Sequence, residues 1–245
     1  RASFYENWLR EVRNSTTKPL FAVGEYWNSN VTIMNEYLEE TNGCMSLFDV
    51  PLHYNFYEAS ISGGNYNMCK ILDNTLIQTN PNKAVTFVDN HDTEPGQSLF
   101  SWVQDWFKPL AYAIILLRDK GLPCVFYGDY YGIPSEKIEA KNIVLDKLLT
   151  LRKNYAYGKL NDYLDNENII GWTLEGDNQH VNSGLAVIMS DNAGGNKQMY
   201  VGKHFANSSF YDYLGNREDI VLIDENGIGK FPVNAGSVSA WIKAL

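Results

Sequence analysis

The stretch AVTFVDNHDT, residues 84–93, is a short apolar strand that runs directly into polar groups. Its apolar part, Ala84–Val88, predicts a buried strand, and Asp92 follows it closely. The stretch FAVGEYW, residues 21–27, has the same pattern, with Glu25 at the end of its apolar run. Parallel strands place their carboxyl ends at one face, where α/β barrels carry their catalytic groups. We therefore expect the carboxylates of Glu25 and Asp92 to converge.

On either side of these stretches, strand-length apolar runs alternate with segments at helical spacing through the first 157 residues. The alternation predicts parallel strands joined by helical crossovers. Strands are expected at Leu20–Glu25, Leu47–Val50, Ala84–Val88 and Cys124–Tyr127, and helices at Ser3–Asn14, Met34–Glu40, Tyr66–Thr75, Asp105–Lys120 and Lys137–Asn154. Four strand–helix units make half of a (β/α)8 TIM barrel, so this α/β part is expected to be incomplete by itself.

The pattern of the sequence changes after Gly158. Alternating stretches such as residues 171–174 and 184–189 are separated by clusters of Asn, Asp and Gly. This pattern predicts an antiparallel all-β domain. The predicted fold class is therefore α/β plus all-β, with a partial TIM-barrel catalytic domain at residues 1–157 and a C-terminal β-sandwich domain at residues 158–245.

The composition argues against two classes of partner. The formal net charge is -9, and nucleic-acid binding needs Lys and Arg to neutralise phosphates. The longest apolar run, residues 110–117, is shorter than the roughly 20 residues of a membrane span. A neutral ligand fits better, and an aromatic content of 13% permits stacking on sugar rings. The three scattered cysteines suggest buried thiols, without a disulfide framework or a zinc site.

Glu25 and Asp92 suit the chemistry of glycoside hydrolysis. This reaction needs one carboxyl group to protonate the leaving oxygen and another to stabilise an oxocarbenium-like transition state. Each residue also has a common structural role, since Glu25 could begin a helix and Asp92 could cap one. In the same way, His91 alone is more often structural, and Trp27 alone is more often part of a core. The occurrence of all four residues at two strand ends favours a functional site.

Four polar residues in succession, Asp89 to Asp92, strengthen that interpretation. They end an otherwise buried strand, where an unpaired polar group costs roughly 1–3 kcal/mol. A hydroxyl-rich ligand would give partners to these side chains, including Asn90 and His91.

These residues also resemble a known family. Gly24-Glu25-Tyr26-Trp27 and Phe87 to Thr93 are similar to the fifth-strand and seventh-strand signatures of the α-amylase family, glycoside hydrolase family thirteen. The similarity continues through residues 48–54, 94–98, 106–112 and 125–132, and the part after Gly158 resembles the family's C-terminal Greek-key domain. The likeness covers essentially the whole chain and is greatest to bacterial liquefying and cytoplasmic α-amylases.

The resemblance implies an endo-acting α-1,4-glucan hydrolase with a retaining mechanism. Glu25 would protonate the glycosidic oxygen and later activate water, while Asp92 would hold the reacting sugar and stabilise the transition state. His91 would bind sugar hydroxyls, and Tyr26, Trp27 and the adjacent Asn28 would form aglycone-side subsites, although Tyr26 has packing as an alternative role.

The family's nucleophile has no counterpart in this sequence. The resemblance places that aspartate at the end of the fourth strand, a few residues before the helix that Ser3 begins, and makes the predicted barrel strands the fifth to the eighth. Strands one to four and an inserted calcium-binding domain are expected upstream of Arg1. The missing N-terminal half of the barrel is thus an expected partner, and the chain alone is expected to have no glycosidase activity.

The resemblance also implies a structural calcium site between the barrel and the C-terminal domain. Its ligands would be backbone oxygens near Gly64 and Tyr66 and side chains near Glu167, Asn168 and Asp191. Calcium takes six to eight oxygen ligands, which this set could supply in part. Asn168 brings no charge, and a simple turn at Asp191 is an equally good interpretation.

Two alternatives to a starch or maltodextrin hydrolase stay open on the sequence. A transglycosylase of the same family would carry the same residues, and a non-catalytic carbohydrate-binding fragment would bind α-glucans without cleaving them. The scattered thiols and the resemblance to cytoplasmic amylases favour a cytoplasmic location, with secretion as the alternative.

Overall fold

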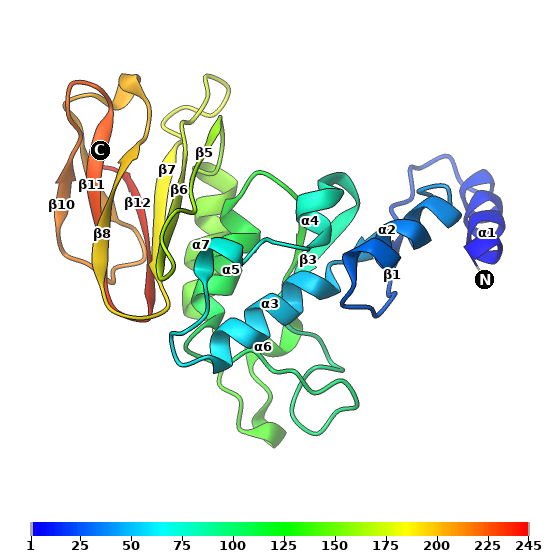
Figure 1. Cartoon of the computed structure of the whole chain (residues 1–245). Coiled ribbons are helices and arrows are strands. Elements are labelled where there is room, and N and C mark those ends of the chain that lie inside the picture. The colour runs from blue at the N-terminus through cyan, green and yellow to red at the C-terminus, as the bar shows by residue number, and fades with distance from the viewer. Residues whose placement is uncertain (1, 245) are drawn as a thin grey trace. The chain divides into compact units, whose positions relative to one another are not determined.

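The structure, a computed structural model, describes residues 2–244 and contains a four-stranded parallel sheet in its first half (Figure 1). The strands lie in chain order, β1-β2-β3-β4, and every neighbouring pair is parallel. Their bounds are β1 Val23–Gly24, β2 Ser46–Phe48, β3 Ala84–Phe87 and β4 Leu122–Cys124. This is the parallel arrangement that the four apolar runs predicted.

Helices separate and follow these strands. Their bounds are α1 Ala2–Asn14, α2 Val31–Glu40, α3 Val50–Ile61, α4 Leu76–Thr79, α5 Lys108–Leu117, α6 Tyr127–Tyr131 and α7 Asn142–Asn154, with 3-10 helices at Met68–Lys70, Pro81–Lys83, Pro134–Glu136 and Lys203–Phe205. No helix among residues 2–244 combines the length and the apolar character that crossing a bilayer demands.

Two predictions between β2 and β3 were wrong. The expected strand at Leu47–Val50 ends at Phe48, and α3 begins at Val50 because Pro51 suits the first turn of a helix as well as it ends a strand. The expected helix at Tyr66–Thr75 is reduced to the 3-10 turn at Met68–Lys70.

Two boundaries near β4 also differ from the prediction. The expected strand at Cys124–Tyr127 lies earlier in the chain, at Leu122–Cys124, and Tyr127 already begins α6. The predicted helix through Lys120 ends at Leu117, so Arg118 lies outside its last turn. The guanidinium group of Arg118 instead binds both carboxylate oxygens of Asp162, at 2.7 and 3.0 Å.

The second half is built from antiparallel strands. Their bounds are β5 Leu160–Tyr163, β6 Ile169–Leu174, β7 Leu185–Ser190, β8 Gly195–Tyr200, β9 Ser209–Asp212, β10 Ile220–Leu222, β11 Ile228–Val233 and β12 Ser237–Lys243. A six-stranded sheet has the order β10-β9-β12-β7-β6-β5, and β11 pairs with β8. Phe210, Phe231 and Trp241 lie in the core cluster that strands of both sheets share. The all-β domain expected after Gly158 is therefore present.

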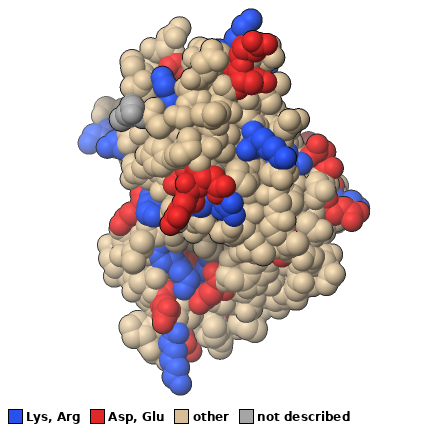
Figure 2. Space-filling view, turned by 90° about the vertical axis from the view of Figure 1, so that its left-hand side faces the viewer, with Lys and Arg blue, Asp and Glu red and all other residues tan. Residues whose placement is uncertain are grey.

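The chain forms two compact units, each of which has many contacts within itself. The first contains Arg1–Asn55, Leu72–Phe87 and Lys120–Cys124, and the second contains Phe56–Ile71, Val88–Asp119 and Val125–Leu245. The whole parallel sheet belongs to the first unit. The antiparallel sheets belong to the second, together with α5 and α7, and the indole nitrogen of Trp172 donates to the carbonyl of Leu117 at 3.0 Å. Figure 2, which views the side on which β8, β10 and β11 lie, shows acidic and basic side chains interspersed.

Candidate active site

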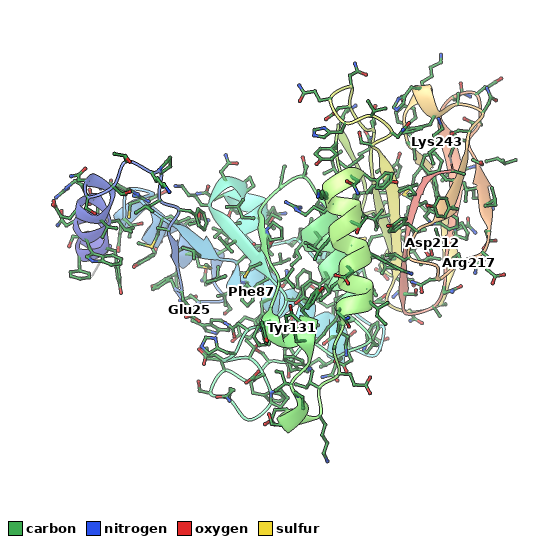
Figure 3. All side chains as sticks on the ribbon, turned by 180° about the vertical axis from the view of Figure 1, so that it is seen from behind. Glu25, Phe87, Tyr131, Asp212, Arg217 and Lys243 are labelled. Carbon is green, nitrogen blue, oxygen red and sulfur yellow. The ribbon has the colours of Figure 1, made fainter. Side chains whose placement is uncertain are left out.

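Glu25 immediately follows β1, and its exposed side chain lines a pocket of about 320 Å³ in the first unit. Tyr5, Trp8 and Tyr26 are among the other residues of this pocket. Figure 3 labels Glu25 and also Phe87, the last residue of β3. Because β1 and β3 belong to one parallel sheet, they end at the same edge, as the sequence predicted.

The two aromatic residues after Glu25 are held by different contacts. The ring of Tyr26 stacks on Tyr37 with centroids 4.2 Å apart. The indole nitrogen of Trp27 donates to the hydroxyl of Tyr54 at 3.1 Å, and its ring lies 5.8 Å from the buried ring of His53. Trp27 is therefore positioned by the start of α3, while Tyr26 packs against Tyr37 and also lines the pocket beside Glu25.

The segment after β3 is tied together by Thr93. Its hydroxyl donates to Asp89 Oδ1 at 2.9 Å and accepts the backbone N–H of Asn90 at 3.0 Å. The side-chain oxygen of Asn90 in turn accepts the N–H groups of Asp92 and Thr93, both at 3.0 Å. Asn90, a predicted sugar-binding residue, thus uses its carbonyl to shape the loop that carries Asp92.

His91 and Asp92 lie side by side on this loop, in the second unit. His91 Nε2 is 3.6 Å from Asp92 Oδ2, with side chains 75% and 34% exposed. The loop therefore presents an imidazole to solvent, with a partly exposed carboxylate beside it. Glu25 belongs to the first unit and Asp92 to the second, and both follow strands of the same parallel sheet in the sequence.

A buried ionic cluster lies beneath the loop, and the sequence did not reveal it. The ammonium group of Lys108, whose side chain is 1% exposed, donates to Asp89 Oδ2 at 2.8 Å and to Asp129 Oδ1. It also lies 3.1 Å from the centre of the Trp102 ring. Tyr112 completes the cluster, because its hydroxyl donates to Asp129 Oδ2 at 2.6 Å.

The cluster contains two carboxyl groups and a tyrosine hydroxyl around a single ammonium group. Burial raises the pKa of Asp89 to about 7; Lys108 opposes this rise and the Asp129 carboxylate adds to it. Burial, together with the neighbouring Asp129, also keeps the pKa of the Tyr112 hydroxyl well above its ordinary value. The sequence signal that could have predicted this cluster is a single lysine, Lys108, at the start of an otherwise apolar helix.

Three of the five predicted metal ligands come together in the second unit. The amide nitrogen of Asn168 donates to the Gly64 carbonyl at 3.1 Å and to Asp191 Oδ1 at 3.0 Å. Glu167 takes part only through its backbone, since its carbonyl accepts the N–H of Met68 at 2.7 Å and its side chain is exposed. Tyr66 is half-buried, and its backbone N–H donates to Ser62 Oγ at 3.1 Å.

This set fits calcium in part. Asp191 Oδ2 is buried and has no hydrogen-bond partner among residues 2–244, and burial raises the pKa of the Asp191 carboxyl group. An orphaned carboxylate oxygen beside the Gly64 carbonyl is the kind of donor that a hard cation takes. Within residues 2–244, however, no group of three or more His, Cys, Asp or Glu side chains is placed to hold a metal.

Comparisons with known proteins agree on one family. A family model described as the alpha amylase catalytic domain matches residues 1–195, and a second, described as the alpha-amylase C-terminal domain, matches residues 185–242. The catalytic-domain match includes Glu25, Asp92 and the buried Lys108 cluster.

Individual relatives match nearly the whole chain. An alpha-amylase of Geobacillus stearothermophilus is 56% identical over 98% of this chain and 44% of its own length. A cytoplasmic alpha-amylase of Escherichia coli is 40% identical over 98% of this chain and 50% of its own length. An alpha-amylase structure from Geobacillus thermoleovorans in complex with acarbose has a TM-score of 0.69 at 15% identity and covers 100% of this chain and 57% of that chain. The chain thus spans half or less of the length of these two sequence relatives.

Proposed function

Because the chain belongs to the alpha-amylase family, we propose that it carries the acid/base glutamate and a transition-state aspartate of an endo-acting α-1,4-glucan hydrolase. One observation carries the proposal. Glu25 directly follows β1 and the His91-Asp92 loop follows β3, and these two strands belong to one parallel sheet. Carboxylates after such strand ends are the groups that glycoside hydrolysis requires.

In this proposal the residues have separate tasks. Glu25 gives a proton to the leaving glycosidic oxygen and later takes one from the attacking water, which is the sequence of a retaining mechanism. Asp92 stabilises the positive charge that develops on the sugar ring, and His91 beside it binds sugar hydroxyls. Trp27, held by Tyr54, offers its ring face to the sugar on the aglycone side.

The proposed enzyme needs a larger polypeptide than these 245 residues. We propose that the four parallel strands form half of a (β/α)8 barrel and that the antiparallel sheets form a Greek-key sandwich. The exposed edge strands β1 and β4 support the first part, since Val23 and Leu122 are 39% and 45% exposed. The retaining nucleophile would come from the complementary half, so the 245-residue chain alone is proposed to be inactive.

We further propose that calcium binds at Gly64 and Asp191. The Gly64 carbonyl and the Asp191 carboxylate would hold the ion, and Asn168 would contribute its amide oxygen after a flip of the amide group. The ion would supply positive charge that ties the segment after α3 to the end of β7. Millimolar calcium is then expected to raise the melting temperature of the chain, and Asp191→Asn is expected to remove that rise.

For the location in the cell, we propose the cytoplasm. The support is the 40% identical cytoplasmic alpha-amylase of Escherichia coli and the unpaired state of Cys44, Cys69 and Cys124.

The proposed activity is tested by completing the barrel. The chain would be fused to the N-terminal part of the Geobacillus stearothermophilus alpha-amylase, and starch hydrolysis would be measured for the fusion and for the 245-residue chain. We expect cleavage by the fusion alone, and a loss of roughly 1,000-fold or more in its Glu25→Gln variant. Glu225→Gln, in an exposed turn, is the matched control. Full cleavage by the Glu25→Gln fusion would refute the assignment.

A further inference from the structure

The short helix α6 carries two exposed aromatic rings that the proposed catalytic groups do not use. Tyr127 and Tyr131 are 72% and 62% exposed. Their ring centroids are 4.6 Å apart at an interplanar angle of 38°. Tyr130 lies between them in the chain, with its ring 4.7 Å from that of Tyr131. Figure 3 labels Tyr131. The two rings therefore pack against each other, and their outer sides form an open aromatic surface.

The helix beneath these rings is firmly anchored. Asp129, in its middle, is fully buried and binds Lys108 and Tyr112, while its backbone carbonyl accepts the N–H of Lys141 at 2.7 Å. The hydroxyl of Tyr130 donates to Asp146 Oδ1 on α7 at 2.7 Å. A surface held in place before a ligand arrives loses little conformational entropy on binding, which favours affinity.

The chemistry of this surface suits a sugar. An aromatic ring offers an apolar face with a polar rim, and the CH faces of a glucose ring match it while the hydroxyl groups stay in water. The segment that follows α6 supplies polar neighbours in the chain, because Ser135, Glu136, Lys137 and Glu139 are all exposed. A tyrosine pair next to polar residues is a poor match for the wholly apolar contact of a protein core.

We propose that Tyr127 and Tyr131 form a stacking platform for a glucose unit of an α-glucan. The choice of an α-glucan as ligand rests on the proposed function. The platform holds a chain of the substrate class by its ring faces and takes no part in bond cleavage.

The test is a calorimetric titration of the 245-residue chain with β-cyclodextrin, a cyclic α-1,4-glucan. The double variant Tyr127→Ala/Tyr131→Ala is expected to bind it roughly tenfold more weakly, the effect of losing two stacking contacts. The double phenylalanine variant keeps both ring faces and is expected to bind within about twofold of the parent. Tyr211→Ala, at a tyrosine that is 37% exposed on β9, is the matched control and should leave the affinity unchanged.

Other outcomes would overturn the platform. One is an unchanged affinity for β-cyclodextrin in the double alanine variant. Another is a loss of affinity in the double phenylalanine variant as large as that in the alanine variant, which would show that the tyrosine hydroxyl groups, and not the ring faces, bind the ligand. An absence of β-cyclodextrin binding by the parent chain would overturn the platform as well. In each case, starch hydrolysis by the fusion and by its Glu25→Gln variant tests the proposed activity separately. Melting temperatures of all variants, compared with the parent, show whether an affinity loss comes from unfolding.

Discussion

At the scale of single residues, the sequence indicated candidate site residues and missed a buried ionic cluster. Glu25, His91 and Asp92 became candidates because acidic and aromatic residues at the end of an apolar strand are unusual. Lys108 gave a weaker signal, a single charge at the start of an apolar helix, and its partners Asp89 and Asp129 lie 19 and 21 residues away in the sequence. Ion pairing between distant segments depends on the tertiary fold, which local patterns do not encode.

The buried Asp89 makes stability depend on pH. Its pKa is raised to about 7 in the folded protein, chiefly by burial, and is close to 3.8 when exposed. Between pH 3.8 and about 7, Asp89 is therefore protonated in the folded protein and ionised in the unfolded protein. The free energy of unfolding therefore falls as pH rises, by at most about 1.4 kcal/mol per pH unit from this group.

The measurement is urea unfolding of the chain at several pH values between 4 and 8. Asp89→Asn cannot titrate, so its free energy of unfolding is expected to fall less steeply with rising pH than that of the parent. The exposed Asp119→Asn is the control and should keep the parental slope. Equal slopes for Asp89→Asn and the parent would show that Asp89 does not titrate in this range.

At the scale of elements, the sequence predicted which segments are strands better than it predicted where they end. The apolar run at β3 is buried throughout and was predicted within one residue of its bounds. The helix α3 was missed because Val50 and Pro51 read as the end of a strand. The determinant is Asp49, whose buried carboxylate accepts N–H groups from the starts of two helices. Its second partner helix, α4, begins 27 residues later, beyond the reach of local patterns.

Asp49→Ala is expected to destabilise the chain by about 2–4 kcal/mol. The carboxylate accepts Leu52 N at 3.3 Å, Leu76 N at 2.9 Å and Ile77 N at 2.7 Å, and alanine leaves these donors buried without partners. Chemical denaturation followed by circular dichroism measures the loss, with the exposed Asp119→Ala as the control. A loss below about 0.5 kcal/mol, the usual range of surface substitutions, would contradict the capping role.

At the scale of the whole molecule, the first unit presents several large apolar side chains to solvent. Large exposed apolar side chains gather in its first 33 residues, namely Phe4, Tyr5, Trp8, Leu20, Phe21, Val23 and Ile33. A contiguous exposed apolar patch on a protein usually marks an interaction surface. In the proposed barrel, the complementary half would cover such a patch.

The 245-residue chain is therefore expected to bind a hydrophobic dye such as ANS. The double variant Trp8→Ser/Phe21→Ser should lower the dye fluorescence, because it removes two of the exposed rings. The control is Val181→Ser/Leu222→Ser, which removes two exposed apolar side chains in the second unit. Equal fluorescence in the parent and in the Trp8→Ser/Phe21→Ser variant would place the apolar surface elsewhere.

The most direct test of the account uses the fusion with the complementary barrel half and its Glu25→Ala variant. Cleavage rates are compared for two substrates whose leaving groups differ in their need for protonation. If Glu25 is the general acid, its removal should slow the cleavage of starch by roughly 1,000-fold or more. It should slow the first-turnover release of 4-nitrophenol from a 4-nitrophenyl maltooligosaccharide far less, because that leaving group departs without protonation and the first turnover precedes the water attack that Glu25 also assists. An equal loss on both substrates, or no loss on starch, would contradict the role of Glu25.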